Sequence, residues 1–130
     1  MKKLTILFLV VFVVFSILVG INILYKPHKD IANSSLDFTI NSKELYNEFT
    51  QDEKKAFKMY SNKVIESSGK ISSIDFDNKS IVLDSILFYQ FDHAIEKTIK
   101  LNQNIKIKAR LVGYDELMNE IKLDQSTILK

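Results

Sequence analysis

Hydrophobic and polar positions divide the chain into an apolar run and a longer segment of mixed polarity. From Leu4 to Leu24, 21 residues carry no charge, and 17 of them are Leu, Ile, Val or Phe. A helix of this length spans about 31 Å, close to the ~30 Å hydrocarbon thickness of a bilayer. The run is apolar on every side, whereas a core helix is shorter and has a polar face. The pattern predicts one membrane-spanning helix with its ends at Leu4 and Leu24.

The residues around this run favour a retained anchor over a cleaved signal sequence. A signal peptide has an apolar region of about 7 to 15 residues, followed by small residues at the cleavage site. Here the nearest such site, 32–34, lies well downstream of Leu24. Lys2 and Lys3 precede the run and orient the N-terminus toward the cytoplasm. We therefore expect a single pass through the bacterial inner (cytoplasmic) membrane, with the C-terminal domain periplasmic or otherwise extracytoplasmic.

Beyond the anchor, residues 1–25, the pattern predicts a linker and one folded domain. Tyr25, Lys26 and Pro27 are expected to mark the outer end of the helix, as an interfacial ring, a snorkelling cation and a helix-ending residue. Residues 26–41 show no clear period and are expected to form a linker, partly extended at Leu36, Phe38 and Ile40. Residues 42–130 are the expected domain, which is long enough for a small core.

The domain begins with a helical period and continues with an alternating one. From Ser42, the expected N-cap, apolar residues recur on one helical face: Leu45, Phe49, Ala56, Phe57 and Tyr60. After residue 62 the alternation predicts five strands, at 64–74, 80–83, 86–91, 105–112 and 120–129. A hairpin turn is expected at 75–79, a bulge at Gly69 and a short helix at 93–101. Asn102 to Asn104 is expected to turn the chain again.

These elements predict a mainly β domain with two helices. Five strands, one preceding helix and a second helix between the third and fourth strands match an OB-fold-like Greek-key barrel. Closing the sheet would remove most exposed strand edges. An open five-stranded α+β sheet is the alternative architecture.

Composition removes several kinds of chemistry. Cysteine is absent, so a disulfide framework, a thiolate metal site and a lipidated cysteine are excluded. The net charge is +2, but without Lys2 and Lys3 the chain carries 16 basic and 16 acidic residues. No global field therefore draws the domain to nucleic acid.

The strongest candidate binding surface combines cations and rings. Along the fourth predicted strand the cations alternate with apolar residues, and an aromatic stretch lies in the third strand; the candidate residues are Lys106, Lys108, Arg110, Phe88, Tyr89 and Phe91. Single-strand binders combine a cationic groove with stacking rings. Three interpretations stay open: a nucleic-acid strand, a peptide or glycan ligand, and a plain solvated strand face.

The sequence contains no complete motif for catalysis or for metal binding. Asp75, Asp77 and Asn78 begin like a calcium loop, but Ser80 and Ile86 stand where glycine and glutamate are needed. Asp92, His93 and Glu96 could be drawn as a metal or acid/base cluster, yet no second histidine lies nearby, and zinc needs three or four ligands. Triads, phosphate loops and nucleotide fingerprints are missing. We expect no enzyme, no metal and no cofactor.

The sequence also resembles the tRNA-anticodon-like OB-fold family (tRNA_anti-like). The matching residues are Lys26 to Ile31, Leu45, Glu48, Phe49, Ala56, Tyr60, Lys63 to Glu66, Gly69, Lys108, Gly113 and Tyr114. The family consists largely of small membrane-anchored or lipoprotein-like envelope proteins, common in Bacteroidetes. This sequence departs from the family pattern at four positions. Asn102 and Ala109 stand where glycines are common in the family, and Leu111 and Ser126 stand where cysteines are often seen. A disulfide at the last two positions cannot form here.

Together these observations predict a non-enzymatic, membrane-anchored OB-fold binding or interaction module of the cell envelope. Its expected partners are the membrane and an envelope protein, peptide or glycan. The alternative is a single-stranded nucleic-acid-binding OB-fold protein, for which an extracytoplasmic location leaves few partners.

Overall fold

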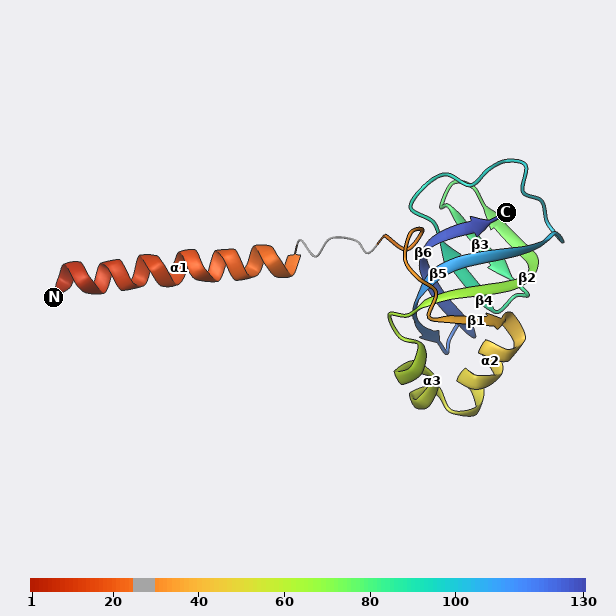
Figure 1. The fold of residues 1–130 in the computed structure, drawn as a ribbon, viewed down its shortest axis with the longest axis horizontal. Coiled ribbons are helices and arrows are strands. Elements are labelled where there is room, and N and C mark those ends of the chain that lie inside the picture. The colour runs from red at the N-terminus through yellow and green to blue at the C-terminus, as the bar shows by residue number, and fades with distance from the viewer. Residues whose placement is uncertain (25–29) are drawn as a thin grey trace.

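The computed structural model describes residues 1–24 and 30–130, and it places an isolated apolar helix before a small barrel (Figure 1). Helix α1 runs from Lys2 to Leu24, which confirms the predicted apolar helix. Within the described residues it is the one helix long and apolar enough to cross a membrane. The expected outer end of the anchor, Tyr25, Lys26 and Pro27, lies outside the described residues.

Five strands close into the predicted barrel. They are β2 (Val64–Asp75), β3 (Ser80–Leu83), β4 (Leu87–Gln90), β5 (Asn104–Asp115) and β6 (Glu120–Leu129). They pair in the order β2-β3-β4-β6-β5, and β5 pairs back onto β2 to complete the ring. All of these pairings are antiparallel except that of β4 with β6. The OB-fold-like Greek-key barrel is thus confirmed.

A further strand, β1 (Phe38–Asn41), lies in the segment expected to be a partly extended linker. It pairs in parallel with the first half of β2, from Phe38 opposite Ile65 to Asn41 opposite Ser68. Because β3 pairs only with the second half of β2, β1 continues the sheet along the part of β2 that β3 does not reach.

The prediction of a single helix from Ser42 to Tyr60 is wrong, because two helices form there. These are α2 (Ser42–Gln51) and α3 (Glu53–Tyr60), with Asp52 between them. The Asp52 carboxylate accepts a hydrogen bond of 3.1 Å from the Lys55 backbone N–H and so caps α3. Asn41, rather than Ser42, caps α2 by accepting from the Glu44 backbone N–H at 2.9 Å.

The two helices cover one end of the barrel (Figure 1). Four of the predicted apolar residues, Leu45, Phe49, Ala56 and Tyr60, are buried there. Phe57 was expected among them but is 45% exposed, because the break at Asp52 turns α3 relative to the period of α2.

The helix expected at 93–101 is also wrong. Residues 91–103 form turns and irregular backbone that cross the other end of the barrel (Figure 1). The Ile71 N–H donates to the Gln103 carbonyl and the Asn102 N–H to the Ile71 carbonyl, both at 2.9 Å. These long-range bonds draw the segment across the barrel end in place of a compact helix. The chain turns at Asn102 as expected, and this residue has a φ of 64°, in the left-handed region that asparagine adopts more readily than most residues.

Gly69 has a different role from the expected bulge. The register irregularity of β2 lies between Ile71 and Ser73, whereas Gly69 pairs regularly with Ile105. A Cβ at position 69 would lie 2.5 Å from Asp84 Oδ2 and 3.2 Å from Leu83 Cβ. The glycine therefore permits the turn between β3 and β4 to lie against β2.

Replacing Gly69 with alanine should displace the Asp84 carboxylate, which accepts a hydrogen bond from the Ser42 hydroxyl. We expect a loss of about 1–3 kcal/mol in the free energy of unfolding, measured by urea titration. Gly113→Ala is the matched control, because its Cβ would be 3.5 Å from the Phe57 ring at an ordinary φ. That control should be neutral or stabilising by up to about 1 kcal/mol. Equal effects at both positions would contradict this role for Gly69.

Candidate functional site

The barrel has a seam along the second half of β6. Over Ile121–Leu123 this strand pairs with β5 on one side and with β4 on the other. β4 ends at Gln90, and its pairing with β6 ends at Leu123, whereas the pairing of β5 with β6 extends to Leu129. Two cavities lie between the second half of β6 and the start of the irregular segment 91–103.

The larger cavity holds about 790 Å³, within the range of small-ligand sites. Its apolar walls come from both sides of the seam: Phe91, Ile95, Ile99, Ile105 and Ile128. Charged side chains stand among the other lining residues, and Lys130 Nζ lies 3.7 Å from Glu96 Oε1 in an exposed ion pair. Lys106 also lines this cavity and pairs with Glu66 at 3.6 Å. The site thus combines an aliphatic interior with polar groups.

The smaller cavity holds about 230 Å³ and is more polar. It shares His93 and Thr127 with the larger one, so the two cavities adjoin along β6. Asp30, Asp92 and Ser126 also line it. The Asn33 amide and backbone N–H donate hydrogen bonds to Asp30, which hold the pKa of that carboxyl below its usual value.

Ser126 is the unusual residue of the smaller cavity. It is 1% exposed, and its Oγ makes no hydrogen bond within the described part of the chain. Leaving a buried hydroxyl unpaired costs about 1–3 kcal/mol, so such groups are uncommon in native proteins. A ligand with a hydrogen-bonding group would satisfy it.

Residues 30–34, the post-anchor segment, form one wall of the smaller cavity. Ile31 is 2% exposed, and Asp30 and Ala32 line the cavity beside it. Lys108 holds this segment in place: its Nζ donates to the Ala32 carbonyl at 3.0 Å and also to the Ser34 carbonyl. The position of the wall therefore depends on a lysine of β5.

The expected basic and aromatic surface does not form as one surface. Side chains alternate across β4, so Phe88 points outward while Tyr89 points into the core. The Tyr89 hydroxyl shares a hydrogen bond with Ser67, and burial raises its pKa. Phe91 follows the end of β4 and is also buried, as a wall of the larger cavity. Two of the three rings are thus closed to a stacking ligand.

The three cations of β5 share a strand face as expected, but each has a partner. Lys108 is nearly buried under the post-anchor segment, and Lys106 is the most exposed of the three. Arg110 donates to both carboxylate oxygens of Asp124, at 2.8 and 2.5 Å, which raises the pKa of the guanidinium. Of the six candidate residues, only Phe91 and Lys106 line the seam.

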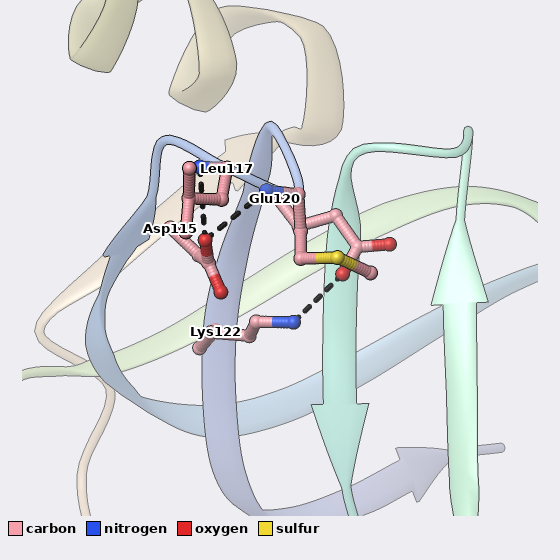
Figure 2. A network of polar contacts seen from close by, with 5 residues as sticks. Asp115, Leu117, Glu120 and Lys122 are labelled. Carbon is pink, nitrogen blue, oxygen red and sulfur yellow. Dashed lines mark hydrogen bonds and ion pairs between the residues drawn. The ribbon is translucent and has the colours of Figure 1, made fainter.

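The outer face of β4 is similarly satisfied. Lys122 Nζ lies 4.3 Å from the centre of the Phe88 ring and 2.7 Å from Glu120 Oε2. Figure 2 shows this ion pair below the β5–β6 turn, where the Asp115 carboxylate accepts hydrogen bonds from the backbone N–H groups of Leu117 and Met118. Ligands of OB-folds usually bind over the second and third strands, here β3 and β4. On that face the single ring of β4 is already covered by a cation.

The candidate cluster Asp92, His93 and Glu96 lies along the seam rather than at one point. Asp92 and His93 line the smaller cavity, and His93 and Glu96 the larger one. Within the described residues, no group of three or more His, Asp or Glu could hold a metal ion. The seam itself gave no sequence signal, because it arises where β4 ends against a longer parallel neighbour.

Comparison with known proteins agrees with the observed barrel. A solved structure named as a putative nucleic acid-binding lipoprotein from Klebsiella pneumoniae matches with a TM-score of 0.53 and 15% sequence identity. The match covers 80% of this chain and 100% of the lipoprotein chain, and at this identity it shows the fold alone. No curated protein matches the sequence. The sequence profile of the tRNA_anti-like family matches residues 1–123, and the chain therefore belongs to the tRNA_anti-like family.

Proposed function

We propose that this protein is a non-enzymatic binding module of the bacterial cell envelope, anchored in the inner membrane by α1, with its barrel on the extracytoplasmic side. The seam beside β6 would hold its ligand, a peptide or a glycan. The observation that carries the proposal is the cavity of about 790 Å³, which combines apolar walls with polar groups. The membrane-spanning length of α1 and the two N-terminal lysines support the location.

A second candidate function is single-stranded nucleic-acid binding. The name of the Klebsiella lipoprotein favours it, since that protein has the same fold. Against it stand the positions of the rings and cations: Tyr89 and Phe91 are buried, and Lys108 and Arg110 already have hydrogen-bond partners. A phosphate backbone would have to displace those partners.

Hydrogen exchange of the full-length chain in lipid nanodiscs distinguishes these functions. The chain is mixed separately with a pool of short apolar peptides, with N-acetylhexosamine oligosaccharides and with oligo-dT. We expect peptides or oligosaccharides to slow exchange in 92–96 and 124–130. Oligo-dT should bind weakly and lose affinity steeply between ~50 and ~200 mM salt. Protection by oligo-dT alone, or no protection of the seam by any ligand, would overturn the proposal.

The location has its own test. A C-terminal alkaline phosphatase fusion is active only outside the cytoplasm, and a C-terminal fluorescent protein matures in the cytoplasm. We expect the phosphatase fusion to be active in intact cells and to remain with the inner-membrane fraction. Activity in the soluble periplasmic fraction would indicate a cleaved N-terminus, and an inactive fusion would place the barrel in the cytoplasm.

A further inference from the structure

The two cavities of the seam adjoin but differ in the chemistry of their walls. His93 and Thr127 line both cavities, so the smaller, polar cavity meets the larger, apolar one at these two residues. The His93 ring lies edge-on to the Phe91 ring, with 6.1 Å between the ring centres, and so borders the apolar wall. A ligand that fills both cavities therefore needs one apolar part and one polar part.

The walls of the larger cavity favour a hydrocarbon chain. Ile95 and Ile105 are nearly inaccessible to water, and Ile99 and Ile128 are partly buried against the barrel core. An alkyl chain gains from leaving water and needs no hydrogen-bond partner in such a space. A sugar in the same place would bury hydroxyl groups that aliphatic walls cannot pair, which is unfavourable.

The charged residues of the larger cavity are exposed and already paired. Lys130 and Glu96 lie 3.7 Å apart, with side chains 89% and 64% exposed. Lys106 is 64% exposed and pairs with Glu66 at 3.6 Å. Because each lysine has a carboxylate partner, neither favours an anionic ligand over a neutral one.

The smaller cavity favours a head group that donates hydrogen bonds. Ser126 is 1% exposed, and among the described residues its Oγ has no hydrogen-bond partner. Asp30 and Asp92 line the same cavity, and their carboxylates accept hydrogen bonds from hydroxyl groups. A phosphate or carboxylate head would instead meet two like charges. Neighbouring hydroxyl groups of a sugar can reach several of these acceptors at once.

A cationic head group suits this cavity less well than a neutral one. The charge of Asp30 is partly balanced by Lys108, and Asp92 acts in the same way on Arg110. Asp30 also accepts two hydrogen bonds from Asn33 already. An added cation would therefore meet two fixed cations near the carboxylates that attract it. A neutral, hydroxyl-rich head meets no such opposition.

The chain itself holds the seam close to the proposed anchor. Helix α1 ends at Leu24, and Asp30, six residues further along, already lines the smaller cavity. Six residues reach at most about 21 Å even when fully extended. The burial of Ile31 and the hydrogen bonds from Lys108 fix the post-anchor segment to the barrel. With α1 in the bilayer, lipids are thus the amphiphiles nearest to the seam.

We infer that the seam binds a glycolipid with a single hydrocarbon chain, taken from the membrane in which α1 lies. Its sugar occupies the smaller cavity and hydrogen-bonds with Ser126 Oγ, and its chain fills the larger cavity beside Ile95 and Ile105. This inference rests on the proposed function. It selects the glycan from the two proposed ligand classes and adds the chain that the aliphatic walls favour.

Photo-crosslinking of the full-length chain in lipid nanodiscs tests the inference. The probe is dodecyl glucoside with a diazirine near the end of its chain, added at low mole fraction. Dodecyl phosphate and dodecyltrimethylammonium with the same diazirine are the matched probes. Mass spectrometry locates the adducts, and labelling of residues 4–24 measures how much of each probe enters the bilayer.

We expect the glucoside probe to label residues 91–106 and 124–130 about tenfold more than either charged probe, after normalisation to α1. The chain should react inside the larger cavity, because these residues supply its apolar walls. Equal labelling of the seam by all three head groups would overturn the placement of the sugar. Labelling of α1 without the seam would overturn the whole inference.

Two isoleucines provide a matched pair of variants. Ile99 lines the larger cavity and Ile74 lines neither cavity, while both are partly buried against the core. Ile99→Gln should lower seam labelling by the glucoside probe about fivefold, because an amide replaces part of the hydrocarbon wall. Ile74→Gln should leave it unchanged. An equal loss in both variants would trace the labelling to a loosened barrel and would overturn the inference.

Ser126→Ala separates ligand binding from stability. Removing an unpaired buried hydroxyl should leave the melting temperature unchanged or raised, yet lower seam labelling by the glucoside probe about threefold or more. Unchanged labelling would overturn the contact with the sugar. Seam protection by peptides or oligosaccharides, without crosslinking to the glucoside probe, would overturn the glycolipid and leave the proposed function standing. Absence of every ligand from the seam would overturn both.

Discussion

Replacing Phe49 with alanine is expected to lower the free energy of unfolding by about 3–5 kcal/mol. Phe49 lies in α2, is 1% exposed and belongs to the core cluster that continues into the barrel. Its ring centre lies 5.9 Å from that of Tyr114 and 6.4 Å from that of Tyr60. Truncation to alanine would remove this packing and leave a cavity. Helices α2 and α3 and strand β5 surround the position and could not relax enough to fill the cavity. Small domains are stable by only ~5–15 kcal/mol, so this loss is a large fraction.

Urea titration of the full-length chain in detergent, followed by circular dichroism, measures the effect. Phe57→Ala is the matched control, because that ring is 45% exposed on the neighbouring helix. We expect the control to cost less than about 1 kcal/mol. If the two substitutions cost the same, α2 would not be part of the barrel core, and the closed end shown in Figure 1 would be only loosely associated.

The sequence was informative where one short-range period decides the structure. The uncharged run of α1, the alternation in β5 and the turn at Asp75 each predict their element without help from distant residues. The OB-fold-like barrel is also confirmed, although its prediction rested on five strands together with a helix between the third and fourth strands that does not form. The turn expected at Asn102 also forms, because asparagine adopts the left-handed conformation more readily than most residues.

The two errors in the predicted helices have different causes, one local and one distant in sequence. Asp52 is a weak interruption in a helical period, yet its side chain caps α3 and divides the predicted helix. The backbone bonds of Ile71 with Asn102 and Gln103 act across the barrel and replace the helix expected at 93–101. No local pattern contains these long-range bonds, whereas the Asp52 cap is a local signal that the helical period of the flanking residues outweighed.

The prediction of one basic and aromatic binding surface was wrong for a related reason. The alternation of polar and apolar residues correctly placed the cations of β5 on the face opposite its core residues. Sharing that face did not leave these cations free to bind a ligand. Lys108 and Arg110 found partners that are distant in sequence, and the aromatic run of β4 was divided between two faces. The seam depends on the unequal lengths of β4 and β6, and only the fold brings Ile31, Ser126 and Phe91 around it.

Lys108→Met should lower the free energy of unfolding by about 1.5–3 kcal/mol, the usual worth of hydrogen bonds to a charged group. Methionine preserves most of the apolar stem of lysine, so the loss reports the ammonium bonds to the Ala32 and Ser34 carbonyls. Exchange of the backbone amides from residue 30 to residue 37 should accelerate. Among the described residues, the burial of Ile31 and the hydrogen bonds between Asp37 and Val64 would then hold this segment to the barrel. Urea titration and hydrogen exchange measure the two effects.

Lys106→Met is the matched control, two residues away on the same face of β5. Its ammonium is exposed and pairs with Glu66 at 3.6 Å, so we expect a cost below about 1 kcal/mol and unchanged exchange in 30–37. Because the post-anchor segment also forms a wall of the seam, Lys108→Met should weaken binding of the seam ligand, although Lys108 does not line either cavity. Equal and small effects of both substitutions would mean that Lys108 is free on the surface. The basic face of β5 would then be open to a phosphate backbone, and the nucleic-acid function would become the better candidate.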